Sequence, residues 1–210
     1  RNGGFRVGTV GKVLDGVEVK IAEDGEILCK GPNVMIGYYK DETQTAEALK
    51  DGYFHTGDIG EIDADGFLKI TDRKKEMFKT SGGKYVAPQM LENTFKQSRF
   101  IEQIMVIGEG EKMPAAFIQP NFEFVREWAS RHNLKFNTNE ELCANQMVID
   151  RIQEEIDHCN EKFGNWEKVK RFELTPEVWS IDAGHLTPTM KLRRKIIKER
   201  YSDLYQKIYG

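Results

Sequence analysis

The sequence predicts an α+β protein in two parts, a β-rich N-terminal part and a C-terminal part in which helices flank a short sheet. Three observations carry this prediction. Residues 17–70 alternate short strand-like runs with glycine-rich and proline-containing turns. Residues 88–208 place apolar side chains at helical spacing, with a few strand-like runs between them. Residues 71–84 are charged and then glycine-rich, which is typical of a linker that runs into a tight loop.

Hairpins dominate the predicted N-terminal part. Residues 17–21 alternate apolar and charged side chains, and residues 26–30 return as a second strand after a turn. Asp63–Gly66 is a hairpin turn between two further strands. Between these hairpins, residues 41–49 are predicted to form a short helix capped by Asp41.

The predicted C-terminal part combines about three strands with amphipathic helices. Pro88 suits the first position of a helix because proline lacks an N–H and has a fixed φ. The helices are expected at residues 88–97, around 124–132, from Leu142 to Phe163 as one stripe of some six turns, and from Leu192 to Ile208; the strands are expected at residues 101–107, 115–119 and around 172–174.

Composition limits the classes of function. The 210 residues carry a net charge of −3, which gives no overall attraction to nucleic acid or anionic lipid. No apolar run approaches the length of a membrane span. The three cysteines, Cys29, Cys143 and Cys159, fit neither a disulfide framework nor a zinc site, so a reducing, cytoplasmic location is expected. The chain opens at Arg1 without a methionine, and we expect it to be the C-terminal piece of a longer polypeptide.

Two side chains near the linker have the chemistry to hold a nucleotide. Asp58 follows Thr56-Gly57 at a strand end, and an ionised carboxylate offers two acceptor oxygens to a vicinal diol such as ribose. Arg73 has a planar guanidinium that suits phosphate or ribose oxygens. A turn-forming aspartate and an ordinary exposed arginine remain the alternative interpretations.

Two further stretches are candidates for anion binding. Ser81-Gly82-Gly83 can expose backbone N–H groups to an anion or admit a narrow substrate arm, although it lacks the spacing of a P-loop; a flexible turn is the alternative. Lys191 follows Thr187-Pro188-Thr189 where the last helix is expected to begin. Six of residues 191–200 are basic, which is consistent with a solvated helix face or with contact to phosphate or lipid headgroups. The four histidines show no ligand spacing, and no metal site is predicted.

In combination, these signals resemble the later motifs of the adenylate-forming superfamily of acyl-CoA synthetases, luciferases and peptide-synthetase adenylation domains. The stretch from Lys79 to Gln89 resembles the long-chain fatty acid–CoA ligase branch in particular. The motifs that carry the resemblance are Gly25–Gly31, Gly37-Tyr38-Tyr39, Gly52–Asp58, Asp72–Glu76 and the C-terminal Lys191.

The resemblance implies a two-step ligase that uses ATP and CoA. A fatty acid carboxylate attacks ATP to give an acyl-adenylate and pyrophosphate, and the CoA thiol then displaces AMP. The implied organisation is the end of a large AMP-binding domain (residues 1–72), a hinge (residues 73–75) and a mobile lid domain (residues 76–210). The implied roles are ribose binding by Asp58, ribose or phosphate binding by Arg73, a hinge at Asp72 and Lys75, CoA binding by Ser81, Gly82, Gly83 and Lys84, and catalysis of the first step by Lys191.

Two departures from the superfamily pattern concern backbone geometry. Asp72 stands where the superfamily has glycine before the hinge arginine, and Met190 stands where many members have glycine before the lysine. The phosphate loop, the adenine pocket and the Mg²⁺ ligands of the family are expected upstream of Arg1, so the chain alone is expected to form no acyl-adenylate.

Two alternative functions stay open at this point. The chain is also compatible with an adenylating enzyme that loads another acid or a carrier protein. A non-catalytic module that binds a membrane surface or nucleic acid is the alternative from another class, although the net charge of −3 and the lack of a basic-aromatic stripe argue against nucleic acid. A peripheral membrane contact of the ligase itself is left open.

Overall fold

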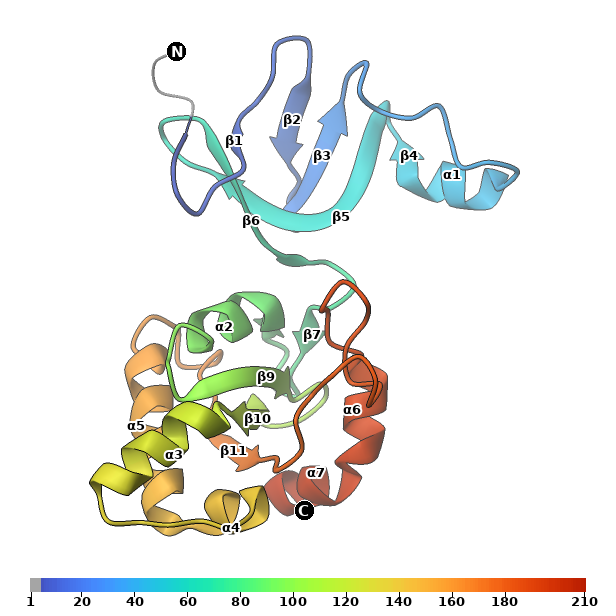
Figure 1. The fold of residues 1–210 in the computed structure, drawn as a ribbon. Coiled ribbons are helices and arrows are strands. Elements are labelled where there is room, and N and C mark those ends of the chain that lie inside the picture. Colours follow the sequence, from blue (N-terminus) through green and yellow to red (C-terminus); the bar gives the residue numbers. More distant parts are fainter. Residues whose placement is uncertain (1–4) are drawn as a thin grey trace. The chain divides into compact units, whose positions relative to one another are not determined.

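The computed structural model describes residues 5–210, and these residues form two compact units. The first unit extends to Met77, and the second is Phe78–Gly210. Figure 1 shows strands prevailing in the first unit, and helices packed around a small sheet in the second. The α+β class predicted from the sequence is confirmed.

Antiparallel pairing builds the sheet of the first unit. The strand order is β1-β6-β5-β3-β2, and β4 also pairs with β5. The elements are β1 (Gly11–Lys12), β2 (Glu18–Ile21), β3 (Glu26–Lys30), α1 (Glu42–Ala48), β4 (Leu49–Lys50), β5 (Tyr53–Ile62) and β6 (Phe67–Arg73).

Local side-chain contacts form the turns and caps of this unit. The Asp63 carboxylate accepts hydrogen bonds from the backbone N–H groups of Asp65 and Phe67, which closes the predicted hairpin turn between β5 and β6. Asp41 caps α1 by accepting a 2.8 Å hydrogen bond from the N–H of Gln44, as predicted.

A three-stranded mixed sheet forms the centre of the second unit. β10 lies in the middle, antiparallel to β9 and parallel to β11. A separate two-stranded hairpin, β7 with β8, precedes it. The elements are β7 (Phe78–Lys79), β8 (Tyr85–Val86), α2 (Pro88–Phe95), β9 (Ile101–Ile107), β10 (Ala115–Pro120), α3 (Phe122–Arg131), α4 (Asn139–Ala144), α5 (Gln146–Asn160), β11 (Arg171–Leu174), α6 (Arg194–Arg200) and α7 (Ser202–Tyr209).

The strands of this sheet bury both faces, which divides the core into two clusters. Along β9, Ile104 and Val106 belong to one cluster, whereas Met105 and Ile107 belong to the other. Successive side chains of a strand point to opposite faces, so a strand covered on both sides carries a continuous apolar run. The first cluster includes side chains of α2, α3 and α5, and the second includes side chains of α6 and α7 (Figure 1).

Two helices that the sequence predicts as continuous are broken in the structure. The stripe from Leu142 to Phe163 divides into α4 and α5, because the Asn145 side chain accepts from the N–H groups of Met147 and Val148 and starts a new helix. The terminal helix divides into α6 and α7 at Tyr201. The apolar periodicity continues across both breaks, so it does not reveal them.

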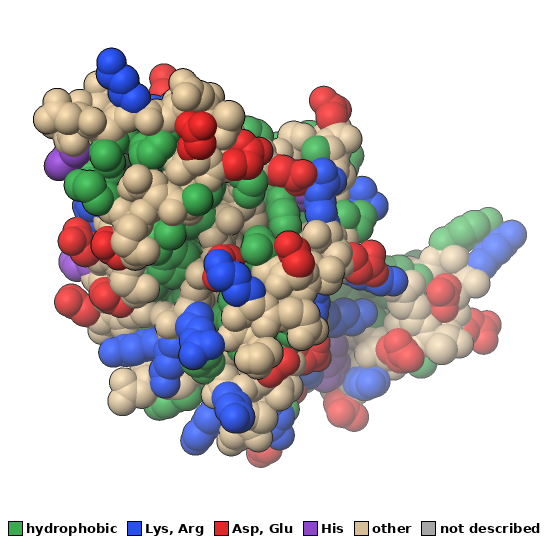
Figure 2. Space-filling view, turned by 90° about the horizontal axis from the view of Figure 1, so that it is seen from below, with side chains coloured by type: hydrophobic (Ala, Val, Ile, Leu, Met, Phe, Trp, Pro, Cys, Tyr) green, Lys and Arg blue, Asp and Glu red, His purple; other side chains and the backbone are tan. Residues whose placement is uncertain are grey.

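Charged side chains of both signs cover the face seen in Figure 2, with several Lys and Arg side chains gathered along its lower edge. Hydrophobic side chains show between them. Within residues 5–210, no helix is long and apolar enough to cross a membrane.

Candidate functional site

The structure brings the predicted nucleotide ligands Asp58 and Arg73 together in the first unit. They are register partners across β5 and β6, and Nε of Arg73 lies 2.8 Å from Oδ1 of Asp58. Gly57, the residue before Asp58, has a φ of +72°, a conformation that glycine adopts without a steric cost. The Asp58 side chain is 21% exposed, so the paired groups remain accessible to a ligand.

A buried glutamate that the sequence analysis missed supports this strand. Glu26 accepts hydrogen bonds from His55 Nδ1 (3.0 Å), the Gly57 N–H (2.9 Å) and Lys74 Nζ (2.8 Å). Burial disfavours its charge, but the hydrogen bonds from Lys74, His55 and Gly57 outweigh burial and lower the pKa of Glu26. These partners come from β5 and from the turn after β6, so Glu26 fixes the backbone on which Asp58 and Arg73 are placed.

A cleft of about 510 Å³ lies beside this glutamate. Glu26, His55, Gly57 and Arg73 line it from strands of the sheet, Lys74 and Lys75 line it from the turn after β6, and α1 also contributes residues. Its lining carries acceptors and cationic donors together, which suits a polar ligand with phosphate groups.

Glu26→Gln is expected to lower the free energy of unfolding by about 2 kcal/mol at neutral pH, since three hydrogen bonds to a charged acceptor weaken. A carboxylate with a lowered pKa stabilises the fold above the ordinary glutamate value of 4.5, and this contribution is lost as the pH falls through that value toward the folded pKa. Urea unfolding on either side of pH 4.5 measures both effects.

Glu61→Gln is the matched control, because Glu61 lies on β5 of the same sheet but is exposed and pairs only loosely with Lys69 at 3.3 Å. It should change the stability by less than about 1 kcal/mol. Equal effects of the two substitutions would show that Glu26 is an ordinary surface carboxylate.

The predicted hinge residues lie at the end of β6 in the first unit. Asp72 is fully buried, and its carboxylate accepts from the N–H of Arg73 at 2.6 Å. The N–H of Lys74 donates to the carbonyl of Gly57, and the Glu76 and Met77 N–H groups donate to Arg73. Lys75 is exposed in this turn. The hinge itself, and the domain limits 1–72, 73–75 and 76–210, remain predictions.

In the second unit, the predicted CoA-binding residues form the turn between β7 and β8. The N–H of Thr80 donates to Lys84 and that of Gly83 to Thr80, whereas the N–H of Ser81 donates to the carbonyl of Glu111. Gly83 has a φ of +79°, and residues 81–84 are exposed. Nζ of Lys84 lies 5.7 Å from the ring centroid of Trp166, which is itself half exposed. The turn therefore offers exposed glycines and a cation to a ligand, although its Ser81 N–H is already used.

Lys191 stands on an exposed hairpin and not on a helix. α6 begins three residues later, at Arg194, which corrects the prediction that the helix starts at Lys191. The N–H of Thr187 donates to the carbonyl of Lys191 (2.8 Å), and the N–H of Lys191 donates to Oγ1 of Thr187 (3.1 Å). Met190 has a φ of +61°, in the left-handed region that favours glycine. This geometry explains why glycine suits the position before the lysine.

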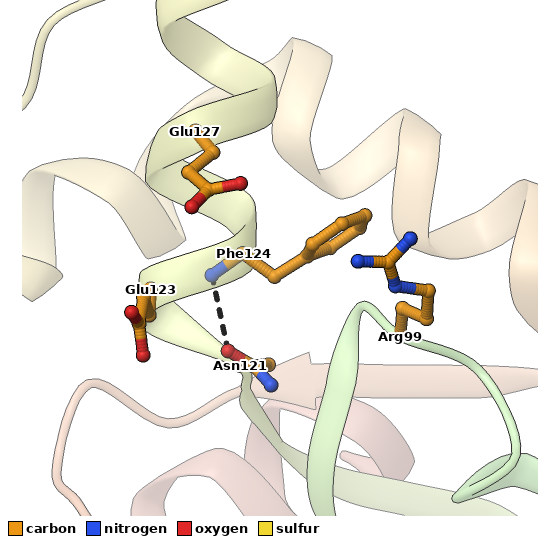
Figure 3. Close-up of a pocket in the computed structure, with 5 residues that line it drawn as sticks. All are labelled: Arg99, Asn121, Glu123, Phe124 and Glu127. Carbon is orange, nitrogen blue, oxygen red and sulfur yellow. Dashed lines mark hydrogen bonds between the residues drawn. The ribbon is translucent and has the colours of Figure 1, made fainter.

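A shallow depression of about 300 Å³ elsewhere in the second unit involves none of the predicted residues. Figure 3 shows the Phe124 ring pointing toward the Arg99 guanidinium, and the guanidinium carbon lies 4.2 Å from the ring centroid. Asn121 caps α3 by accepting from the N–H of Phe124, and Glu123 points away from Arg99 (Figure 3). The depression therefore lies at the capped N-terminus of α3, and these structural contacts explain its lining without a ligand.

The geometry therefore defines two separate candidate sites, one in each unit. The first holds Asp58 and Arg73 on the strand pair that Glu26 supports; the second unit carries the glycine turn and the Lys191 hairpin. A paired carboxylate and guanidinium in one unit, and an exposed lysine and a glycine turn in the other, are groups that can bind a polar ligand with hydroxyl and phosphate groups. No group of three or more His, Cys, Asp or Glu side chains among residues 5–210 is arranged to hold a metal ion, and Mg²⁺ is assigned no ligand in this part of the chain.

Comparison with known proteins defines the family. The model of the AMP-binding enzyme C-terminal domain matches residues 76–210, and the chain belongs to this family of adenylate-forming enzymes. Long-chain-fatty-acid–CoA ligase FadD15 of Mycobacterium tuberculosis is 37% identical over 207 residues, which covers 98% of this chain and 34% of that protein. Long-chain-fatty-acid–CoA ligase 1 of Homo sapiens is 42% identical over 191 residues, which covers 89% of this chain and 27% of that protein.

Solved structures show the same fold at lower identity. The adenylation domain of a carboxylate reductase from Mycobacterium chelonae has a TM-score of 0.75 at 22% identity, over 97% of this chain and 34% of that chain. The corresponding domain from Segniliparus rugosus, in complex with AMP and a carboxylic acid, has a TM-score of 0.72 at 22% identity, over 91% and 31%. The chain thus spans about a third of the length of the relatives that it matches.

Proposed function

We propose that this chain is the C-terminal portion of an AMP-forming ligase that joins a long-chain fatty acid to CoA. The observation that carries the proposal is the identity of 37–42%, over nearly the whole chain, to relatives named as long-chain fatty acid–CoA ligases. The arrangement of the site residues supports it, because Asp58, Arg73, Lys84 and Lys191 each stand where a ligand can reach them.

In the first step the fatty acid carboxylate attacks the α-phosphate of ATP. A bond forms between a carboxylate oxygen and the α-phosphorus, the bond from that phosphorus to the β-phosphate bridge breaks, and pyrophosphate leaves with the electron pair. Asp58 would accept hydrogen bonds from the ribose hydroxyls, and Arg73, paired to it at 2.8 Å, would hold a ribose or phosphate oxygen. The Lys191 ammonium would offset the repulsion between the carboxylate and the phosphate.

In the second step the CoA thiol, losing its proton, attacks the acyl carbon. A thioester bond forms, the acyl–oxygen bond breaks and AMP leaves. The exposed glycines of the β7–β8 turn would lie against the pantetheine arm, because a residue without a side chain allows close backbone approach, and Lys84 would pair with a CoA phosphate.

The test uses the complete enzyme with ATP, CoA and a series of fatty acids of increasing length. The proposal expects acyl-CoA as the product, with the highest kcat/KM for long-chain acids. A parallel reaction supplies a carrier protein bearing a phosphopantetheine group in place of CoA. It distinguishes the proposed CoA ligase from an adenylating enzyme that loads a carrier protein. Preferred transfer to this carrier, or preference for a short or aromatic acid, would reject the assignment.

Lys75→Pro in the complete enzyme is expected to impair thioester formation more than adenylation. Proline would fix φ near about −65° at the proposed hinge and so restrict the rotation between the two steps. Lys75→Ala is the control, since it removes the exposed ammonium and leaves the backbone free. The rates of the two half-reactions, measured separately, test this prediction. Equal losses in both half-reactions would argue against a hinge at Lys75.

A further inference from the structure

A buried histidine that the mechanism does not use lies beneath the Lys191 hairpin. His185 has no exposed surface. Its ring is nearly parallel to those of Trp179 and Tyr201, with interplanar angles of 16° and 8° and centroid distances of 6.1 and 6.2 Å. Trp179 and Tyr201 are themselves buried, so the three rings form one packed aromatic group.

In the part of the chain that the structure describes, Nε2 of this ring has polar partners and Nδ1 has none. Nε2 of His185 lies 3.4 Å from Oε2 of Glu177 and 3.5 Å from the Tyr201 hydroxyl. Glu177 is also held by Arg200, whose Nε lies 2.7 Å from Oε2, and by the Tyr201 hydroxyl. Nδ1 is buried and has no hydrogen-bond partner among residues 5–210. The surroundings thus satisfy a neutral ring with its proton on Nε2 better than an imidazolium, which needs a second acceptor.

The backbone of His185 closes the base of the hairpin that carries Lys191. Its N–H donates to the carbonyl of Ser180 (3.0 Å), and its carbonyl accepts from the N–H of Arg193 (2.8 Å). Leu186 and Leu192 form the next antiparallel bridge, directly above it. Lys191 lies on the same hairpin. A shift of the His185 ring would therefore displace the backbone that positions the Lys191 ammonium.

We propose that His185 is a positioning residue for Lys191, and that its buried, uncharged ring holds the hairpin in the geometry needed for adenylation. This inference rests on the proposed function, because it assigns the effect to the first half-reaction. His185 touches no reacting group; it acts through the hairpin backbone.

Protonation of His185 is expected to destabilise the hairpin that carries Lys191. The titratable groups that face the ring are Glu177, in the segment after β11, and Arg200 and Tyr201, at the end of α6. Burial and the nearby Arg200 charge lower the pKa of His185, and the Glu177 carboxylate opposes them only in part. A lowered pKa means that the neutral ring stabilises the fold fully above the ordinary histidine value of 6.5, and that this contribution is lost as the pH falls below it toward the folded pKa.

The experiment compares the two half-reactions of the complete enzyme as a function of pH. Acyl-adenylate formation is followed by ATP–pyrophosphate exchange, and transfer to CoA is followed from supplied acyl-adenylate. The variants are His185→Phe, which keeps a flat ring that cannot titrate, and His185→Ala, which removes the ring. His158→Gln is the control, because His158 is an exposed histidine on α5.

In the parent enzyme, the adenylation rate should fall by up to about tenfold per pH unit once the pH is below the pKa of His185 in the folded enzyme. This is the decrease expected when one proton inactivates the enzyme. His185→Phe should flatten this decrease relative to the parent, and His158→Gln should leave it unchanged. His185→Ala should slow adenylation about tenfold or more at neutral pH, because a displaced catalytic group costs rate steeply. Transfer from supplied acyl-adenylate should change little in any variant.

Two results would overturn the inference. One is an acid-side decrease that survives unchanged in His185→Phe; the other is an equal loss of both half-reactions in His185→Ala and His185→Phe, which would indicate a general effect on folding. A parent enzyme that forms no acyl-adenylate at any pH would instead reject the proposed function.

Discussion

Replacing Lys191 by alanine in the complete enzyme is expected to slow acyl-adenylate formation about 100-fold. A preorganised cation that stabilises charge on the reacting phosphoryl oxygens is typically worth about 3 kcal/mol. Lys191 is exposed, and the hairpin beneath it is fixed by the hydrogen bonds between Thr187 and Lys191. The Lys191 ammonium is therefore carried by a flexible side chain on a backbone that is held in place.

The same variant should pass supplied acyl-adenylate to CoA at close to the parental rate, because the proposed rotation turns Lys191 away from the nucleotide. Arg193→Ala and Lys198→Ala are matched controls from the same basic segment and should have far smaller effects. Rapid-quench measurement of each half-reaction provides the comparison. A loss of thioester formation as severe as the loss of adenylation would refute the role.

Glu92→Ala is expected to lower the free energy of unfolding by about 3–5 kcal/mol, the range for breaking a buried ion pair from one side. Glu92 on α2 is 5% exposed and accepts from Nη1 (2.8 Å) and Nη2 (2.7 Å) of Arg194, the first residue of α6. It also accepts from the N–H of Val106. Val106 lies on β9, an edge of the three-stranded sheet, whose outer N–H groups need such partners.

Lys207→Ala is the control for this prediction. Lys207 pairs with Glu173 at the same distance of 2.7 Å, but the lysine side chain is 66% exposed, so its removal should cost less than about 1 kcal/mol. Replacing both Glu92 and Arg194 by apolar residues should restore part of the stability, since the desolvation cost of both charges of this pair is then removed. Chemical unfolding of the single and double variants tests this; a loss below 1 kcal/mol in Glu92→Ala would contradict it.

This ion pair also revises the interpretation of the basic C-terminal segment. The sequence favoured a solvated helix face, but Arg194 pairs with Glu92 and Arg200 pairs with Glu177. Two of the six basic side chains therefore attach α6 to the rest of the unit. Sequence spacing could not show this, because the acidic partners lie up to 102 residues away along the chain.

The elements that sequence reasoning predicted well are those fixed by short-range signals. β9 and β3 have the predicted limits because an apolar run or an alternating run ends at a turn residue on each side. The breaks at Asn145 and Tyr201 were missed because an apolar stripe continues across a change of helix axis. The turn at Asp63–Gly66 alone does not predict the pairing of Asp58 with Arg73, because the register shifts between Ile59 and Gly60 and this shift places Arg73, and not Asp72, opposite Asp58.

The supporting residues of the site could not be predicted in the same way. Glu26 begins a strand after a turn, where an exposed glutamate is common, and its partners His55, Gly57 and Lys74 are 29 to 48 residues away. His185 has no signal in the sequence, because its burial depends on rings contributed by Trp179 and Tyr201. Burial and long-range pairing are properties of the assembled fold.

A single-turnover experiment with ATP labelled at the α-phosphate tests the central claim most directly. The complete enzyme is mixed with a long-chain fatty acid and the labelled ATP without CoA, and CoA is then added. We predict that labelled acyl-adenylate accumulates first, and that CoA converts it to labelled AMP and acyl-CoA in equal amounts. Formation of ADP, or the absence of any labelled acyl intermediate before the addition of CoA, would contradict the assignment of this chain to an AMP-forming ligase.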